Sequence, residues 1–228
     1  MQTEQEIQDV AKAVISFTDS FAQNKQGKQN EQPESQSTSS VTKICSTLQF
    51  LRNQILINST CKQVITIPKL LQSLSTISRF KVGTHIDEEV DLQRLELIQR
   101  SRLCLFWIQD NGDEQIQTEL VNNEYGRVMS ISFSTAGGIN EEQDFEIFNG
   151  LYHISGFLRA LYKGRNNEWQ PSFQPLPLLA RRSEEQIEEE GANEEIEAQM
   201  SIKGYYGGIK FWANETKAVI LNCFIHRR

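Results

Sequence analysis

The residues of this chain that could do chemistry are three histidines, four cysteines and a run of glutamates. The histidines, His85, His153 and His226, are far apart in sequence, and none lies beside a cysteine or carboxylate in a ligand pattern. A nucleophilic pair such as Cys104 with His153 would have to form through folding, because catalytic partners converge in space rather than in sequence. A lone histidine among apolar residues is more often a core residue. We therefore predict no catalytic residue and no enzymatic activity.

The other sites that could hold a ligand also lack their usual spacing. Cys45, Cys61, Cys104 and Cys223 have no close pair of the kind that binds structural zinc. The turn at 135–138 lacks the glycine and lysine pattern of a phosphate loop, and acidic residues follow it. The eight glutamates within 184–197 lack the alternating ligands of a calcium loop. We therefore predict no metal and no cofactor.

The N-terminal residues carry an apolar stripe that a helix over 4–22 would place on one side. Its members recur at spacings of 3, 4, 3 and 4: Ile7, Val10, Val14, Phe17 and Phe21. Residues 23–40 contain no apolar residue, so we expect a disordered polar linker over 23–42, which makes 1–22 an amphipathic arm. Two alternatives remain open: the arm docks on its own domain, or it joins a neighbouring subunit.

We expect a single α+β domain over 43–228, with a helical part at 43–102. From 103 the period changes to that of strands. The apolar run 103–108, the Asn111-Gly112 turn and the alternation over 116–121 and 129–133 predict an antiparallel sheet. A long apolar helix at 141–163 should pack across this sheet. We further expect a proline-rich extended segment at 169–177, an acidic loop at 181–195 and C-terminal strands from 196 to 225.

Aromatic and basic residues alternate in the C-terminal segment, as they do in proteins that bind single-stranded nucleic acid. The residues that would make such contacts are Lys203, Tyr205, Lys210 and Trp212. The formal net charge of −7 opposes this use, and aromatic residues in strands usually pack in a core. Nucleic-acid binding is therefore the weaker alternative.

The chain has 228 residues, no signal-like segment and no run of apolar residues that would span a membrane. This predicts a protein of the cytoplasm or nucleus. Features of association outnumber features of catalysis, so we expect a non-enzymatic interaction or assembly protein, such as a viral matrix or capsid component. Its partner would be itself, in a homo-oligomer formed through the N-terminal stripe, or another protein. The alternative is an enzyme whose site assembles from distant residues.

Overall fold

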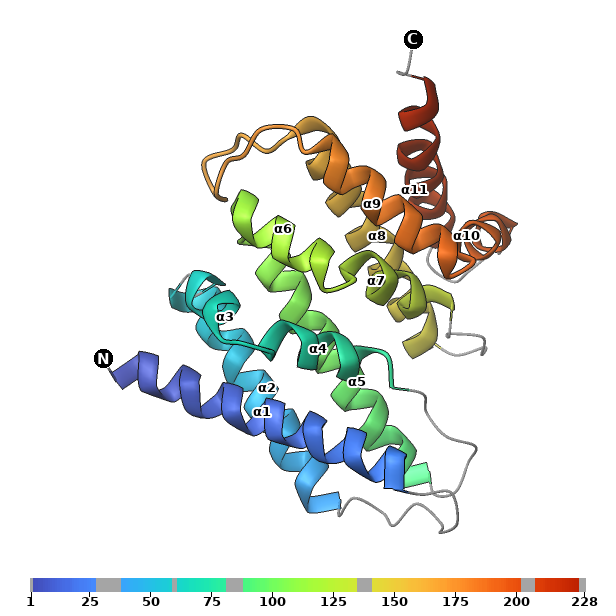
Figure 1. Cartoon of the computed structure of the whole chain (residues 1–228). Coiled ribbons are helices and arrows are strands. Elements are labelled where there is room, and N and C mark those ends of the chain that lie inside the picture. Colours follow the sequence, from blue (N-terminus) through green and yellow to red (C-terminus); the bar gives the residue numbers. More distant parts are fainter. Residues whose placement is uncertain are drawn as a thin grey trace. The chain divides into compact units, whose positions relative to one another are not determined.

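The computed structural model describes residues 2–27, 38–58, 61–80, 88–134, 141–201 and 208–225. The chain divides into two compact units, Met1–Gly112 and Asp113–Arg228. These described ranges contain eleven helices and no strand, apart from one isolated bridge between Arg165 and Phe173 (Figure 1). Each unit is therefore a helical assembly with its own core, and the division lies between Gly112 and Asp113, inside the single domain predicted for 43–228.

The first unit is built around α5. This helix packs mainly against α2 and α4, while α1 covers α2 and α4. The five helices are α1 (Gln2–Gly27), α2 (Thr38–Asn58), α3 (Cys61–Thr66), α4 (Leu70–Ser78) and α5 (Glu88–Asp110). Polar side chains join the helices as well as apolar ones: Ser101 on α5 donates a hydrogen bond to the carbonyl of Leu74 on α4 at 2.8 Å. The polar residue inside the apolar stripe of α5 is thus satisfied.

The second unit is built around α8, which contacts α7, α9 and α11. Its helices are α6 (Glu114–Asn122), α7 (Tyr125–Ser134), α8 (Glu141–Lys163), α9 (Pro177–Glu189), α10 (Ala192–Ser201) and α11 (Gly208–Ile225). At the centre, the buried ring of Tyr125 meets that of Phe157 edge-on, with centroids 4.9 Å apart. The helix predicted at 141–163 is confirmed as α8, but it packs on other helices instead of a sheet.

The predicted α+β fold is therefore wrong, and residues 103–108 show why. This run belongs to α5, and it continues the helical stripe of the residues before it. The buried positions recur at the spacing of one helix face: Leu97, Ile98, Ser101, Cys104, Leu105 and Ile108. The serine within this stripe hides its continuity in the sequence. Asn111-Gly112 ends a helix instead of turning a hairpin, and Asp113 caps the next one by accepting a hydrogen bond from the Ile116 amide.

The other predicted strands are also helical. The segments 116–121 and 129–133 form parts of α6 and α7, and the C-terminal segments belong to α10 and α11. Residues 181–195, which were expected to form an acidic loop, instead form most of α9, a short turn at Gly191 and the start of α10. Of the linker predicted at 23–42, residues 23–27 belong to α1 and residues 38–42 to α2, and the rest lies outside the described residues. The extended proline-rich segment is confirmed up to Leu176, after which Pro177 opens α9.

Candidate interaction surfaces

The N-terminal stripe lies against its own unit. Ile7 and Val14 are buried, while Val10, Phe17 and Phe21 are half-buried. The ring of Phe21 stacks on Phe80 at the end of α4, with centroids 4.1 Å apart. Of the two docking modes left open by the sequence, the structure contains the one in which the helix covers its own domain. The first unit therefore uses these side chains to complete its own core.

The second unit has a cluster of aromatic side chains on α8 and α11, which we term the aromatic cluster. It consists of Phe145, Phe148 and Tyr152 on α8 with Phe211 and Trp212 on α11. The Tyr152 ring meets the Trp212 ring edge-on at 4.8 Å, and Trp212 meets Phe211 at 5.1 Å. Phe145 is 61% exposed, Phe211 55% and Tyr152 43%. Phe211 and Tyr152, whose rings both contact Trp212, thus remain about half exposed to solvent.

The outward side of α11 extends this surface. Its inward residues, Ile209, Ala213, Thr216 and Ile220, are buried at helical spacing, and the helix packs on α8 and α10. Three of the four outward residues at helical spacing, Phe211, Ala218 and Leu221, are also apolar; the fourth is Asn214, and all four are exposed. A helix that is largely apolar on both sides is usually covered on both. Within the described chain, this outward side has no cover.

α8 and α11 approach closely because small residues lie between them. A Cβ atom on Gly208, at the start of α11, would lie 2.7 Å from the ring of Phe148. Arg159 on α8 pairs with Glu215 on α11, with 2.6 Å between Nη2 and Oε2. The buried hydroxyl of Thr216 donates to the carbonyl of Leu151 at 3.1 Å. These contacts fix the rings of the aromatic cluster relative to each other.

A second exposed aromatic side chain lies in the loop between α8 and α9. The backbones of Arg165 and Phe173 exchange two hydrogen bonds of 2.8 and 2.9 Å, and the Arg165 guanidinium lies over the Phe173 ring. Asn167 Oδ1 accepts from the amides of Trp169 and Gln170. This ordered loop leaves Trp169 88% exposed. The base of the loop and α6 border an open polar hollow lined by Asp113, Glu114, Gln115, Thr118 and Ser172.

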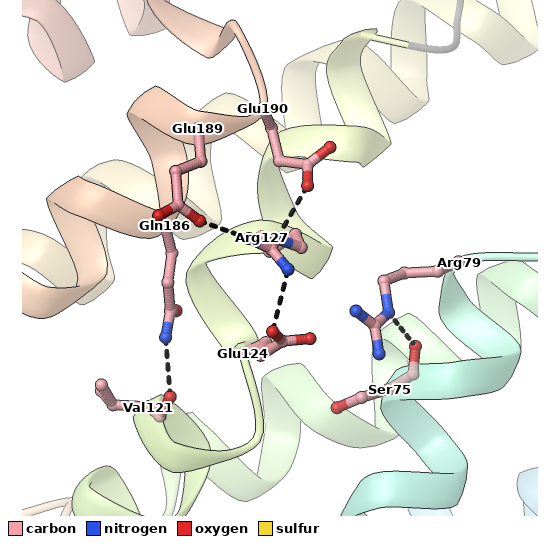
Figure 2. Close-up of polar contacts among 8 residues, drawn as sticks. All are labelled: Ser75, Arg79, Val121, Glu124, Arg127, Gln186, Glu189 and Glu190. Atoms are coloured by element: carbon pink, nitrogen blue, oxygen red, sulfur yellow. Dashed lines mark hydrogen bonds and ion pairs between the residues drawn. The ribbon is translucent and has the colours of Figure 1, made fainter.

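Arg127 on α7 holds three carboxylates (Figure 2). Its guanidinium contacts Glu124 at 2.8 Å and Glu190 at 2.7 Å, and it also pairs with Glu189. Beside it, Gln186 on α9 donates a hydrogen bond to the carbonyl of Val121 at 2.8 Å. The charged run that was expected to be a solvated loop is thus fastened to α6 and α7. This cluster is a structural brace of the second unit.

Cys45 and Cys104 are buried and have the properties of core residues. Burial raises the pKa of the Cys45 thiol to about 11, with Glu96 adding to the shift, and burial raises that of Cys104 to about 12. Cys104 also donates a hydrogen bond to the carbonyl of Leu48 at 3.3 Å. A nucleophilic cysteine needs its thiolate form at neutral pH, which these pKa values oppose.

His153 has a pKa too low for an effective catalytic base at neutral pH. It lies half-buried on α8, and burial lowers its pKa to about 4. It is therefore neutral at pH 7, with little affinity for a proton. The described residues hold no group of three or more histidine, cysteine or acidic side chains placed to bind a metal ion.

The predicted nucleic-acid contacts are only partly within the described chain. Lys203 and Tyr205 lie outside the described residues. Lys210 is exposed on α11, and Trp212 is half-buried within the aromatic cluster. They lie on a helix and not on strands, so the sheet-like stacking platform that motivated this alternative is absent from the described residues. No helix in the described ranges has a stretch long and apolar enough to cross a bilayer.

Comparison with known proteins adds no relative. No protein-family model matches the chain, and no curated protein matches its sequence. The functional argument therefore rests on the surfaces themselves. Sequence reasoning missed the aromatic cluster, because it assigned Phe145 and Tyr152 to a core and Phe211 to a strand. A signal was present in the spacing of Phe211, Ala218 and Leu221, which gives α11 a second apolar side.

Proposed function

We propose that this chain is a non-enzymatic assembly protein that associates with copies of itself through the aromatic cluster and the outward side of α11. The observation that carries this proposal is the exposure of Phe145, Tyr152 and Phe211 on two helices that contact each other. Exposed apolar patches of this kind in soluble proteins usually mark interaction sites. Aromatic side chains are also enriched in the centres of interfaces.

The amount of apolar surface fits an association of moderate strength. Burying a large apolar side chain completely stabilises by about 1.5–3 kcal/mol. Phe145, Phe211 and Leu221 are each about half exposed and Tyr152 somewhat less, so each would contribute roughly half of that amount. The gross gain of several kcal/mol must exceed the entropy lost on association. We therefore expect association that depends on protein concentration.

Light scattering over a range of concentrations tests this proposal. The wild type should change from monomer to a defined oligomer as concentration rises, and the double variant Phe211→Ser/Leu221→Ser should weaken the oligomer at least tenfold. Leu178→Ser is the matched control, because Leu178 is equally apolar and more exposed but lies on α9. A wild type that stays monomeric at its highest soluble concentration would refute self-association.

Exchange of α1 between copies is a second form of the same function. Every contact that α1 makes with α2 and α4 can be made by α1 of a second copy, as in domain swapping. Phe21 and Phe80 provide the test, because their stacked rings show that the two side chains meet. In a Cys61→Ser/Cys223→Ser background, Phe21→Cys and Phe80→Cys proteins that are unfolded and refolded together under reducing conditions should be joined into a heterodimer by a bifunctional thiol reagent if α1 is exchanged.

The double variant Phe21→Cys/Phe80→Cys detects the opposite outcome, in which α1 is not exchanged. If α1 stays in its own unit, the bifunctional thiol reagent joins the two cysteines within one chain, and this variant remains a monomer on a denaturing gel. The single variants, mixed as above, then give no heterodimer. That pair of results would remove exchange of the N-terminal stripe while leaving the aromatic cluster as the association surface.

A further inference from the structure

The outward side of α8 carries a stripe whose chemistry complements itself. Its residues recur at spacings of 4, 3, 4, 3 and 4, and each is exposed or half-buried: Phe145, Asn149, Tyr152, Gly156, Arg159 and Lys163. These spacings place them along one face of the helix. Gly156 lies near the middle of the solvent-facing part of this stripe.

Gly156 has no explanation among the residues that the structure describes. A glycine inside a helix costs about 1 kcal/mol relative to alanine, and a close packing contact is the usual reason for it. Gly150 on the same helix has such a contact, because a Cβ atom there would lie 2.2 Å from Ser132 Oγ. A Cβ atom on Gly156 would meet nothing within 4 Å. The space above Gly156 is therefore open to a helix from outside.

The residues on either side of Gly156 suit a second α8 that runs in the opposite direction. Tyr152 lies four residues before Gly156 and Arg159 three residues after it. In an antiparallel pair related by a twofold axis at Gly156, the tyrosine ring of one copy therefore faces the guanidinium of the other. A guanidinium over an aromatic ring is a favourable cation–π contact. In the same arrangement Asn149 faces Lys163, which can donate a hydrogen bond to the amide oxygen.

α11 holds both partners of this contact in place. The ring of Tyr152 packs edge-on against Trp212, and Arg159 is paired with Glu215. Side chains that are already held lose less conformational entropy on binding. The aromatic and cationic groups are thus positioned before a partner arrives.

The charge distribution favours a second copy on this face. The exposed side chains of the α8 stripe include two cations, Arg159 and Lys163, and no acid. Seven of the eighteen acidic residues of the second unit lie on α9 and α10, and the four on α8 lie in its first two turns, at the opposite end from Lys163. In an antiparallel pair the acidic start of each α8 therefore lies toward the cationic end of the other, which limits like-charge repulsion.

We propose that two copies of this chain form a symmetric dimer in which their α8 helices cross at Gly156, with Tyr152 of each copy against Arg159 of the other. This inference rests on the proposed self-association and specifies its geometry. It places the twofold axis at one residue, which makes it testable by cross-linking.

Cysteine cross-linking at the axis is the first test. In a background carrying Cys61→Ser and Cys223→Ser, the variant Gly156→Cys should form a disulfide dimer at least tenfold faster than Glu188→Cys under mild oxidation. Glu188 is the matched control because it is exposed on α9, away from the stripe. Equal rates for the two variants would overturn the proposed axis.

A charge at the axis is the second test. Gly156→Lys should weaken the dimer at least tenfold in light scattering without lowering the melting temperature, because its side chain has open space in the monomer. If the oligomer survives Gly156→Lys but is lost in Phe211→Ser/Leu221→Ser, this geometry is wrong and the proposed function stands. If the wild type is a monomer at every concentration, both proposals fail.

Discussion

The two units use their apolar residues in opposite ways. The first unit covers its core with the amphipathic α1, and the large apolar side chains exposed among its described residues, Leu56, Ile57 and Leu92, are aliphatic and come from two helices. In the second unit, by contrast, the exposed set includes the aromatic residues Phe145, Tyr152, Trp169 and Phe211. The difference shows that an amphipathic stripe in the sequence need not be the surface that a protein offers to partners.

The units also differ in charge. Residues 1–112 contain 12 Lys and Arg against 12 Asp and Glu, whereas residues 113–228 contain 11 against 18. The whole net charge of −7 therefore belongs to the second unit. Its association should strengthen as salt is added, because salt screens the repulsion between two acidic units. The neutral first unit gives no such dependence of its own.

The largest expected effect on stability distinguishes the buried apolar residues of the first unit from the exposed ones of the second. Val14→Asp places an unpaired charge in the core of the first unit and should destabilise it by about 3 kcal/mol or more. Phe211→Asp adds the same charge on the exposed side of α11 and should change stability by less than about 0.5 kcal/mol. Hydrogen exchange of each unit measures both. Equal losses of protection would contradict the distinction between core and surface.

The two glycines of α8 should respond with opposite signs. Gly150→Ala brings a methyl group against Ser132 and Phe133 of α7, so it should cost about 1–3 kcal/mol. Gly156→Ala meets no neighbour in the monomer and gains helix propensity, so it should stabilise the monomer by about 0.5–1 kcal/mol. Urea unfolding at low protein concentration measures both. A loss of stability in Gly156→Ala would show that its surroundings are more crowded than described.

The brace around Arg127 provides an effect of intermediate size. Arg127→Met keeps most of the side-chain volume but leaves Glu124, Glu189 and Glu190 without their shared cation. We expect a loss of about 1–2 kcal/mol, since the carboxylates are partly exposed and then repel each other. The loss should shrink in high salt. An Arg181→Met variant, which removes a single exposed pair with Glu185, should change stability by at most a few tenths of a kcal/mol.

A smaller effect should follow from His153 and should appear only in acid. Because its pKa is lowered to about 4 in the fold and is near 6.5 when unfolded, the unfolded chain binds the extra proton between these values. Stability should therefore fall as pH decreases from about 6.5 to about 4, by on the order of 1 kcal/mol for a partly exposed ring. Thermal melts of wild type and His153→Gln measure this. An identical pH dependence in both proteins would contradict it.

The smallest effect concerns the thiols and leaves stability unchanged. In the Cys61→Ser/Cys223→Ser background, native protein at pH 7.5 should react with a thiol reagent far more slowly than unfolded protein, because Cys45 and Cys104 are buried with raised pKa values. Cys104 should be the slower of the two. Rapid labelling of native Cys104 would instead revive the enzyme alternative.

Most of what the sequence could predict about the fold came from the helical periodicity of its apolar residues. The stripe of α1 and the cap-to-cap length of α8 were predictable, because their apolar residues recur without interruption. The error began at residue 103, where aromatic and branched residues suggested a strand. Hydrophobic periodicity assessed over a longer stretch of sequence, including Ser101, would have predicted that the helix continues. The same holds for Ile209, Ala213, Thr216 and Ile220, whose helical spacing includes one polar residue.

Exposure was beyond the reach of the sequence. Phe145 and Phe157 lie on the same helix and have the same side chain, yet one is exposed and the other buried. Which face of α8 meets α7, α9 and α11 depends on packing between segments distant in sequence. The glycines show the same limit: Gly150 and Gly156 look alike in the sequence, since both interrupt an apolar helix, but within the described chain only Gly150 has a close contact.

The junction between α5 and α6 satisfies its own backbone locally. The amide of Asn111 donates a hydrogen bond to the carbonyl of Trp107, and the amide of Gly112 donates one to the carbonyl of Gln109. The Asp113 carboxylate caps α6. A cut made after Gly112 would therefore leave both helix ends with their hydrogen bonds intact. We therefore expect each half to fold as a separate polypeptide, and the association of the acidic half could then be measured without the neutral one.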